Sequence, residues 1–326
     1  MKSLAKVLVS VFLLFGAVSS VHAQNYEEYS QHFFDGLYAM YCNEYLDAIE
    51  YFSKELKDNP NSIDALILIS NCYNSDASKE YKKALSYTDK AINILAKADV
   101  DDDIKSSVYA SRGYSYIQLG KFDKAIECYS KAIGYSPDEP DFYMYRADCY
   151  LELNKYDLFE IDCKTIVSLD PSNITAYMYL GSISGMKEDN AKAIEYYSKV
   201  IEIDNEFSPA YARRGAFYYA IGEKEESVDD MIKALDLADE QASNFLLNKS
   251  AVDTDYLNLI VDKMKAKNDE NPDNPIWLYW IGMIYENNGL YKEALHYYEK
   301  VYEKVYEISE LSPMLEIIEE VKKKIE

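Results

Sequence analysis

Residues 113–133 read GYSYIQLGKFDKAIECYSKAI, and the meaning of this stretch decides the fold. Gly120 and Lys121 raise the question of a phosphate-binding loop. Such a loop needs four residues between its first glycine and the Gly-Lys pair, and then serine or threonine. Here six residues separate Gly113 from Gly120, and Phe122 follows Lys121, so the spacing excludes that loop.

The same stretch recurs along the chain with a period of 34 residues. Five registers stay in phase over four successive copies, which indicates a repeat array rather than chance similarity. The registers are Tyr109, Tyr143, Tyr177 and Tyr211; Gly113, Ala147, Gly181 and Gly215; Tyr116, Tyr150, Ser184 and Tyr218; Ala125, Phe159, Ala193 and Ser227; and Tyr129, Cys163, Tyr197 and Met231.

Each 34-residue unit divides into two amphipathic helices. Before Gly120, apolar and small side chains fall at helical spacing, and a second helical pattern covers 122–133. Pro137 then ends the second helix, because proline cannot continue one. Gly113 and Ala125 are small where the two helices cross, so we expect a close antiparallel pair.

This pattern resembles the tetratricopeptide repeat, a 34-residue helix-turn-helix unit, at Tyr109, Gly113, Tyr116, Ala125, Tyr129, Ala132 and Pro137. The resemblance implies an all-α fold, a right-handed superhelical solenoid of stacked antiparallel helix pairs. We expect about seven to eight units within residues 24–312, starting near 29, 63, 106, 140, 174, 208, 241 and 275. A capping helix over 313–326 would cover the last apolar face. Residues 98–105 are expected to form a linker.

Residues 1–23 differ from the rest of the chain. Lys2 and Lys6 precede an apolar run over 7–18, and small residues end at Ala23. This order predicts a secretory signal peptide cleaved before Gln24, and hence an exported protein, periplasmic or secreted. An uncleaved anchor is the alternative, but the run is short against the ~20 residues that a membrane span needs. No stable membrane span is expected after cleavage.

Charge and cysteine content restrict the partners. The net charge is −23, and loss of the predicted signal, which carries two lysines and no acid, makes it −25. Such a chain repels nucleic acid and favours basic partners. The five cysteines are odd in number and form no C-x-x-C pair, so we expect buried free thiols, although the predicted export would permit a bridge.

The sequence offers no catalytic, cofactor-binding or metal-binding set. After residue 23 only His32 and His296 remain as histidines. The acidic fragments at 99–103 and 269–273 lack the glycine and the glutamate of a calcium loop, so we expect solvated acidic segments there. We therefore expect a non-enzymatic protein without a cofactor.

The family resemblance implies that the first helix of each unit lines a concave face that holds a peptide. A clamp for a terminal carboxylate, found in some relatives, is not expected, because Ser107 and Ser111 occupy its places. The predicted function is an exported scaffold for a protein or peptide partner with basic or apolar anchors. The alternatives are a structural subunit of a cell-envelope assembly or secretion complex and, disfavoured, an enzyme on a helical-repeat scaffold. The candidate lining residues are Met40, Tyr41, Ile67, Asn71, Tyr114, Ile117, Met144, Asp148, Met178, Met186, Tyr219, Tyr279 and Met283.

Overall fold

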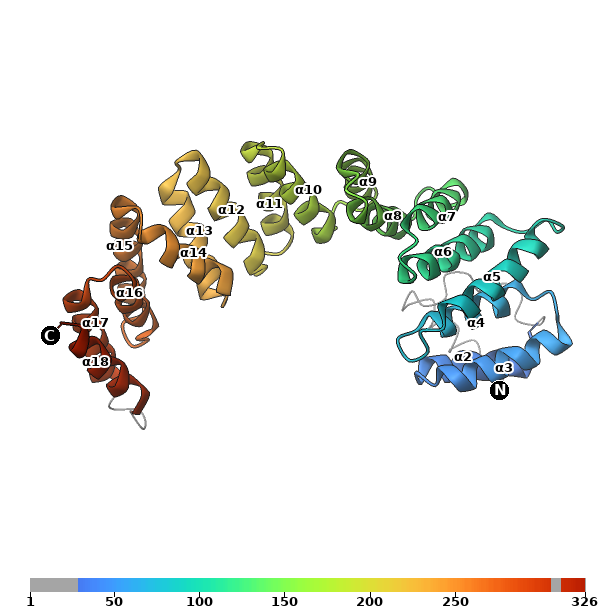
Figure 1. Ribbon diagram of the computed structural model, residues 1–326, viewed down its shortest axis with the longest axis horizontal. Coiled ribbons are helices and arrows are strands. Elements are labelled where there is room, and N and C mark those ends of the chain that lie inside the picture. Colours follow the sequence, from blue (N-terminus) through green and yellow to red (C-terminus); the bar gives the residue numbers. More distant parts are fainter. Residues whose placement is uncertain (1–28, 306–311, 326) are drawn as a thin grey trace. The chain divides into compact units, whose positions relative to one another are not determined.

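The computed structural model describes residues 29–305 and 312–325, and every regular element in these residues is an α-helix (Figure 1). This confirms the all-α prediction. The expected signal peptide, residues 1–23, lies outside the described residues. None of the helices in the described ranges is long and apolar enough to cross a membrane.

Within the described residues, the helices form eight consecutive pairs followed by one terminal helix. They are α2 (Gln31–Tyr41), α3 (Tyr45–Asp58), α4 (Ile63–Asn74), α5 (Tyr81–Leu95), α6 (Asp102–Gln118), α7 (Phe122–Tyr135), α8 (Pro140–Glu152), α9 (Tyr156–Leu169), α10 (Ile174–Met186), α11 (Asn190–Ile203), α12 (Ser208–Ile221), α13 (Lys224–Asp236), α14 (Glu240–Ser250), α15 (Thr254–Glu270), α16 (Ile276–Asn287), α17 (Tyr291–Val305) and α18 (Ser312–Ile325).

The chain divides into two compact units, the first ending at Ala176 and the second beginning at Tyr177. The first unit holds the pairs α2/α3, α4/α5, α6/α7 and α8/α9. The second holds most of α10 and the helices from α11 to α18. Within each unit, helices that follow one another along the chain pack together, as α6 packs on α7 and α12 on α13.

An aromatic ring of the second helix lies against a glycine of the first helix in four of the pairs. A Cβ added at Gly113 would lie 2.7 Å from the Tyr129 ring, which is far below van der Waals contact. The rings are themselves buried, so the missing side chain is what lets the two helix axes approach. The four contacts are Gly36 with Phe52, Gly113 with Tyr129, Gly181 with Tyr197, and Gly282 with Tyr298.

The corner between the two helices of a pair uses left-handed backbone. Lys121 N–H donates to the Tyr116 carbonyl at 2.8 Å, which closes the helix end behind a left-handed residue. Glycine adopts that conformation without a Cβ penalty, and asparagine tolerates it. Four such residues follow the 34-residue period: Gly120 (φ 66°), Asn154 (φ 55°), Glu188 (φ 61°) and Gly222 (φ 89°). Gly120 is therefore a corner residue.

One segment differs from its prediction. Residues 98–105 were expected to form a linker, but α6 begins at Asp102, so the prediction is wrong for residues 102–105. Asp102 and Asp103 occupy the first turn, where carboxylates interact favourably with the positive end of the helix dipole. Lys105 Nζ also lies 2.8 Å from Asp102, one turn away. Acidic composition here stabilises a helix start.

A partly buried arginine ties three helices together in the first unit. Arg146 of α8 donates to both carboxylate oxygens of Asp162 in α9, at 2.8 and 2.7 Å, and to the Ser130 hydroxyl in α7 at 3.0 Å. Its guanidinium also lies over the rings of Tyr143 and Tyr150. The same side chain therefore fixes its own pair and the preceding one.

The second unit repeats this arginine cluster at positions 68 residues later, two repeats along. Arg214 donates to Asp230 through two 2.8 Å bonds and to Ser198 at 2.9 Å. One repeat after Arg146 the place is taken by Leu180, which is 0% exposed. The same position thus accepts either an ion pair or an apolar side chain.

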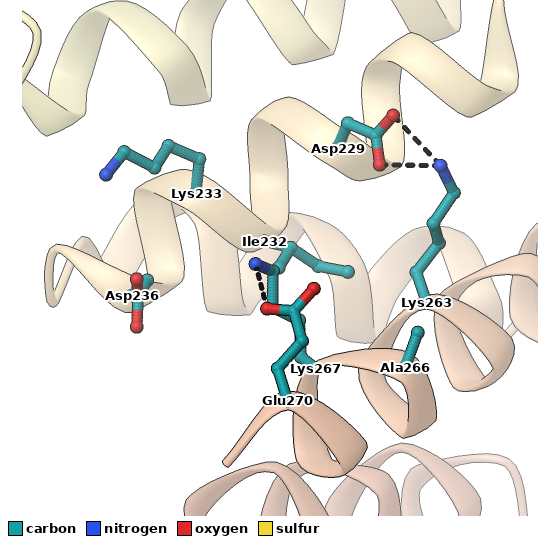
Figure 2. A pocket seen from close by; sticks show the side chains of 8 residues that line it. All are labelled: Asp229, Ile232, Lys233, Asp236, Lys263, Ala266, Lys267 and Glu270. Carbon is teal, nitrogen blue, oxygen red and sulfur yellow. Dashed lines mark hydrogen bonds and ion pairs between the residues drawn. The ribbon is translucent and has the colours of Figure 1, made fainter.

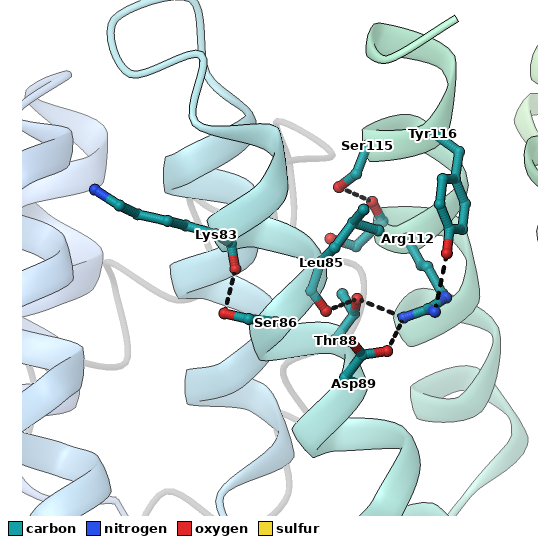
Figure 3. Close-up of polar contacts among 9 residues, drawn as sticks. Lys83, Leu85, Ser86, Thr88, Asp89, Arg112, Ser115 and Tyr116 are labelled. Atoms are coloured by element: carbon teal, nitrogen blue, oxygen red, sulfur yellow. Dashed lines mark hydrogen bonds and ion pairs between the residues drawn. The ribbon is translucent and has the colours of Figure 1, made fainter. Parts of the chain in front are cut away.

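Arg112 reaches a different partner from its counterparts. The position 16 residues after it is Cys128, not aspartate, and the guanidinium instead contacts Asp89 of α5 (Figure 3). It also donates to the Tyr116 hydroxyl at 3.0 Å. Arg112 therefore joins α6 to the preceding pair rather than to its own second helix.

We predict that Gly113→Ala destabilises the protein by ~1–3 kcal/mol, because the new methyl group overpacks the Tyr129 ring. Gly134→Ala is the matched control. Nothing lies within 4 Å of a Cβ at Gly134 in α7, so alanine should stabilise there by ~0.5–1 kcal/mol. Urea unfolding followed by circular dichroism measures both. Equal effects of the same sign would contradict the crossing geometry.

We predict that Arg146→Leu costs ~3–5 kcal/mol, because it leaves the carboxylate of Asp162, 2% exposed, without its cation. The double variant Arg146→Leu/Asp162→Leu should recover most of that loss, since apolar pairs replace buried ion pairs at little cost. Urea unfolding midpoints of the wild-type protein, the single variant and the double variant measure these differences in stability. A double variant as unstable as the single one would show that the arginine is needed for more than charge balance.

Candidate functional site

The candidate site is the surface formed by the first helices of the pairs, here called the first-helix surface. In the first unit it comprises α2, α4, α6 and α8, and α6 contacts both α4 and α8. In the second unit it comprises α10, α12, α14 and α16, of which α14 contacts both α12 and α16. The thirteen predicted lining residues all lie on these helices, and they differ in exposure.

Ile67 does not belong to the accessible surface. Its side chain is 1% exposed and packs with Leu66, Ala91 and Val108 in a buried cluster between α4, α5 and α6. The repeat register predicts Ile67 as a lining residue. In fact α4 is buried from Ile63 to Ser70, since helices cover it on several sides.

Asn71 belongs to a polar seam between α4 and α6. Its side-chain oxygen accepts a 2.7 Å hydrogen bond from the Ser111 hydroxyl. Ser70 lies 2.9 Å from that hydroxyl, and Asn74 accepts from Ser115 at 2.9 Å. Most of these groups are buried, so their hydrogen bonds satisfy one another. The seam joins neighbouring first helices and leaves Asn71 at its half-exposed edge.

Tyr114 pairs with a residue that the sequence prediction missed. Its ring meets that of Tyr145 on α8 at a centroid distance of 6.2 Å and an angle of 85°. Tyr145 is 39% exposed and stacks behind on the buried Tyr129 at 5.3 Å. Tyr114 and Tyr145 are 31 residues apart, which is one 34-residue repeat less about one helical turn. This spacing places them side by side on neighbouring first helices, and it is the feature of the sequence that could have predicted the pair. Met144 and Asp148 lie half-buried on the same helix.

The other predicted residues of the first unit range from half-buried to exposed. Met40 packs at the edge of the core formed by α2, α3 and α4, while Tyr41 is 56% exposed at the end of α2. Ile117 packs at the edge of the core around Tyr129.

In the second unit, three of the predicted residues pack against neighbouring rings or the core, and two lie half-buried or exposed on α10. Tyr219 meets Phe245 and Tyr256 at centroid distances of 5.6 and 4.8 Å, and its hydroxyl donates to Asp253 at 3.2 Å. Tyr279 and Met283 pack against the core that α18 covers. Met178 is half-buried, whereas Met186 is 64% exposed at the end of α10.

A pocket of about 430 Å³ lies elsewhere, between the second helices α13 and α15 (Figure 2). Its charged groups largely pair with each other. Lys263 lies 2.7 Å from Asp229, and Lys267 lies 2.8 Å from Glu270. Opposite charges in near balance give the pocket no electrostatic preference for a ligand, so it is not the candidate site. Its lining is Asp229, Ile232, Lys233, Asp236, Lys263, Ala266, Lys267 and Glu270.

Four of the five thiols are unsuited to nucleophilic chemistry. All five cysteines are free, and four of them are buried. Burial raises the pKa of Cys72, Cys149 and Cys163 to about 12 and that of Cys128 to about 11, so the reactive thiolate is suppressed. Cys42 alone is exposed. Among the described residues, no group of three or more His, Cys, Asp or Glu side chains could hold a metal ion.

Comparison with known families identifies the repeats. The family profile described as "TPR repeat" matches residues 113–154, which include the opening stretch. The profile described as "Tetratricopeptide repeat" matches residues 174–207 and 278–303.

Two curated proteins resemble short parts of the chain. The mitochondrial import receptor subunit TOM70 of Rattus norvegicus is 37% identical over 73 residues, which is 22% of this chain and 12% of the receptor. The Hsp70-Hsp90 organizing protein 3 of Arabidopsis thaliana is 34% identical over 65 residues, 20% of this chain and 12% of that protein. The match thus spans only a small share of either relative.

Two solved structures resemble the chain over a larger part. The C-terminal part of a TPR repeat-containing protein from Cytophaga hutchinsonii is 15% identical and covers 85% of this chain and 100% of its own, with a TM-score of 0.57. The structure of YrrB, a TPR protein, is 19% identical and covers 60% of this chain and 96% of its own, with a TM-score of 0.50. At such identities the likeness concerns the fold. With the matched repeats and the stacked helix pairs, it shows that this chain contains tetratricopeptide repeats and has the all-helical fold of a TPR solenoid.

Proposed function

We propose that this protein is a non-enzymatic scaffold that binds a protein or peptide partner through its first-helix surface. The observation that carries the proposal is the group of tyrosine and methionine side chains that stay partly exposed there. Tyr41 is 56% exposed, Tyr145 39% and Met186 64%. The cores of the helix pairs are filled by buried rings of the second helices, such as Tyr129 and Tyr197, and not by these exposed side chains. These side chains are therefore available for contact.

The chemistry of this surface suits a peptide. Methionine is flexible and polarisable, so it adapts to different apolar side chains. Tyrosine combines a large contact area with a hydroxyl group at modest entropic cost. The net charge of −23 adds a preference for basic partners and speeds their association.

The curated relatives support a role in binding other proteins. One is described as an import receptor subunit and the other as an organizing protein for Hsp70 and Hsp90. Their likeness is confined to about a fifth of this chain, so it supports the class of function and not a particular partner.

A structural subunit of an envelope assembly is the second candidate, and exposed apolar residues on a second helix favour it. Leu158 and Ile161 of α9 are 43% and 58% exposed and lie one turn apart. A subunit held by its second helices would use such residues. The two candidates therefore predict contact with a partner on different helices of the same pair.

We predict that a photo-crosslinking amino acid at position 144, in place of Met144, gives discrete adducts with one partner in the native host. The same amino acid in place of Ile161 is the matched control on the other helix of the pair and should give none. Denaturing gels and mass spectrometry identify the adducts. Adducts from position 161 without adducts from position 144 would favour the structural subunit and contradict the scaffold proposal.

We also propose that the protein acts outside the cytoplasm. The support is the order of Lys2, Lys6, the apolar run and the small residues that end at Ala23. Export should leave a mature protein that begins at Gln24. Sequencing the N-terminus of protein from fractionated cells tests this, and an intact Met1 in the cytoplasmic fraction would contradict it.

A further inference from the structure

The Tyr114–Tyr145 pair is held in place from behind. Tyr145 stacks on Tyr129 at 5.3 Å with an interplanar angle of 17°, and Tyr129 in turn lies against Gly113. Tyr114 then meets Tyr145 at 85°. Since the buried ring of Tyr129 is fixed by the helix crossing, the exposed ring of Tyr145 is positioned before any ligand arrives.

Aspartates contribute to the electrostatics of this aromatic pair. Burial raises the pKa of Tyr114, and the charge of Asp76 raises it further. Burial also raises the pKa of Tyr145, with added contributions from Asp141 and Asp148. A negative charge close to a phenol disfavours the phenolate, so the aspartates add a smaller effect of the same sign to that of burial on both pKa values. In the described ranges, no lysine or arginine lies over either ring.

The second unit contains a similar aromatic pair that is already occupied. Tyr219 of α12 and Phe245 of α14 meet at 5.6 Å and 86°, again across neighbouring first helices. The ammonium of Lys249 lies 5.1 Å from the centre of the Tyr219 ring and 5.7 Å from that of Phe245. Asp253 accepts a hydrogen bond from the Tyr219 hydroxyl and supplies the nearby negative charge.

The two pairs differ in the residue that supplies the cation. Lys249 follows Phe245 by four residues, so the two share one face of α14. The residue four places after Tyr145 is Cys149, which is 1% exposed and carries no positive charge. The Tyr114–Tyr145 pair therefore has the perpendicular rings without a lysine at the equivalent place on its helix.

We propose that Tyr114 and Tyr145 bind a lysine side chain of the partner, with the ammonium over the rings and near Asp141, four residues before Tyr145 on α8. This inference rests on the proposed function and names the chemistry that the same surface recognises. A cation over an aromatic ring is attracted by its negative face, and the neighbouring carboxylates strengthen the attraction. The partner is thus a lysine-containing segment, with apolar side chains for the methionines beside it.

The test measures the binding of a defined peptide to the full chain by fluorescence anisotropy. The probe is a fluorescein-labelled nine-residue peptide with three lysines separated by leucine and serine. The matched peptide carries Nε-acetyl-lysine at the same three places, which keeps the stem and removes the charge. We expect the lysine peptide to bind about 3- to 30-fold more tightly, and high salt to reduce the difference.

Two variants locate the binding. Tyr114→Leu and Tyr145→Leu should each weaken the lysine peptide about 3- to 30-fold and leave the acetylated peptide unchanged. Tyr135→Leu is the matched control, because Tyr135 is 37% exposed but lies on α7. Circular dichroism checks that all three variants keep their helix content.

A further variant should create a site. Lys249→Met removes the internal cation from Tyr219 and Phe245, so the lysine peptide should then bind with a stoichiometry of two instead of one.

Specific results overturn the inference. Equal binding of the two peptides, or an equal effect of Tyr135→Leu, would show that no lysine site exists at this pair. If Tyr114→Leu weakened both peptides alike, the surface would bind peptides without selecting the cation. Failure of the broader proposal looks different, because it would appear as crosslinks from position 161 and none from position 144.

Discussion

The close crossing of the two helices in a pair is the constraint on which the rest of the structure depends. At Gly113 the first helix has no side chain, and the ring of Tyr129 fills the space against its backbone. Interiors pack at crystal-like density, so even one added methyl group at such a point must displace its neighbours. The same solution recurs at Gly36, Gly181 and Gly282. A 34-residue period follows, because each crossing needs a corner and a second helix of fixed length.

The crossing also determines what remains for a partner. Where a first helix carries the crossing glycine, the face with that glycine packs against the aromatic ring of the second helix. Another face contacts the neighbouring first helix, as in the Ser–Asn seam between α4 and α6, and arginine clusters such as that of Arg146 reach second helices, here α7 and α9. What is left is a strip of tyrosine and methionine side chains. Tyr145 shows the connection most clearly, because its exposed ring stacks directly on the buried Tyr129.

The sequence predicts the helix pairs well because their determinants are local and periodic. Small residues, tyrosines and corner residues recur every 34 residues, so each copy supports the others. Contacts between pairs were harder to predict. The burial of Ile67, the seam at Asn71 and the bond from Arg112 to Asp89 depend on how one pair sits on the next. The 68-residue recurrence of Arg146 and Arg214 was visible in the sequence but acquires meaning only with Asp162 and Asp230 beside them.

Methionine methyl groups offer the most direct test that a partner occupies the first-helix surface. The chain carries them on first helices and, separately, in the core of the second and terminal helices. NMR of 13C-methyl-methionine protein, with and without the crosslinked partner, reports both sets at once. If the partner binds the first-helix surface, the methyl chemical shifts of the first set should change. Changes confined to the second set would contradict binding at that surface. The first set is Met40, Met144, Met178, Met186 and Met283, and the second is Met231, Met264 and Met314.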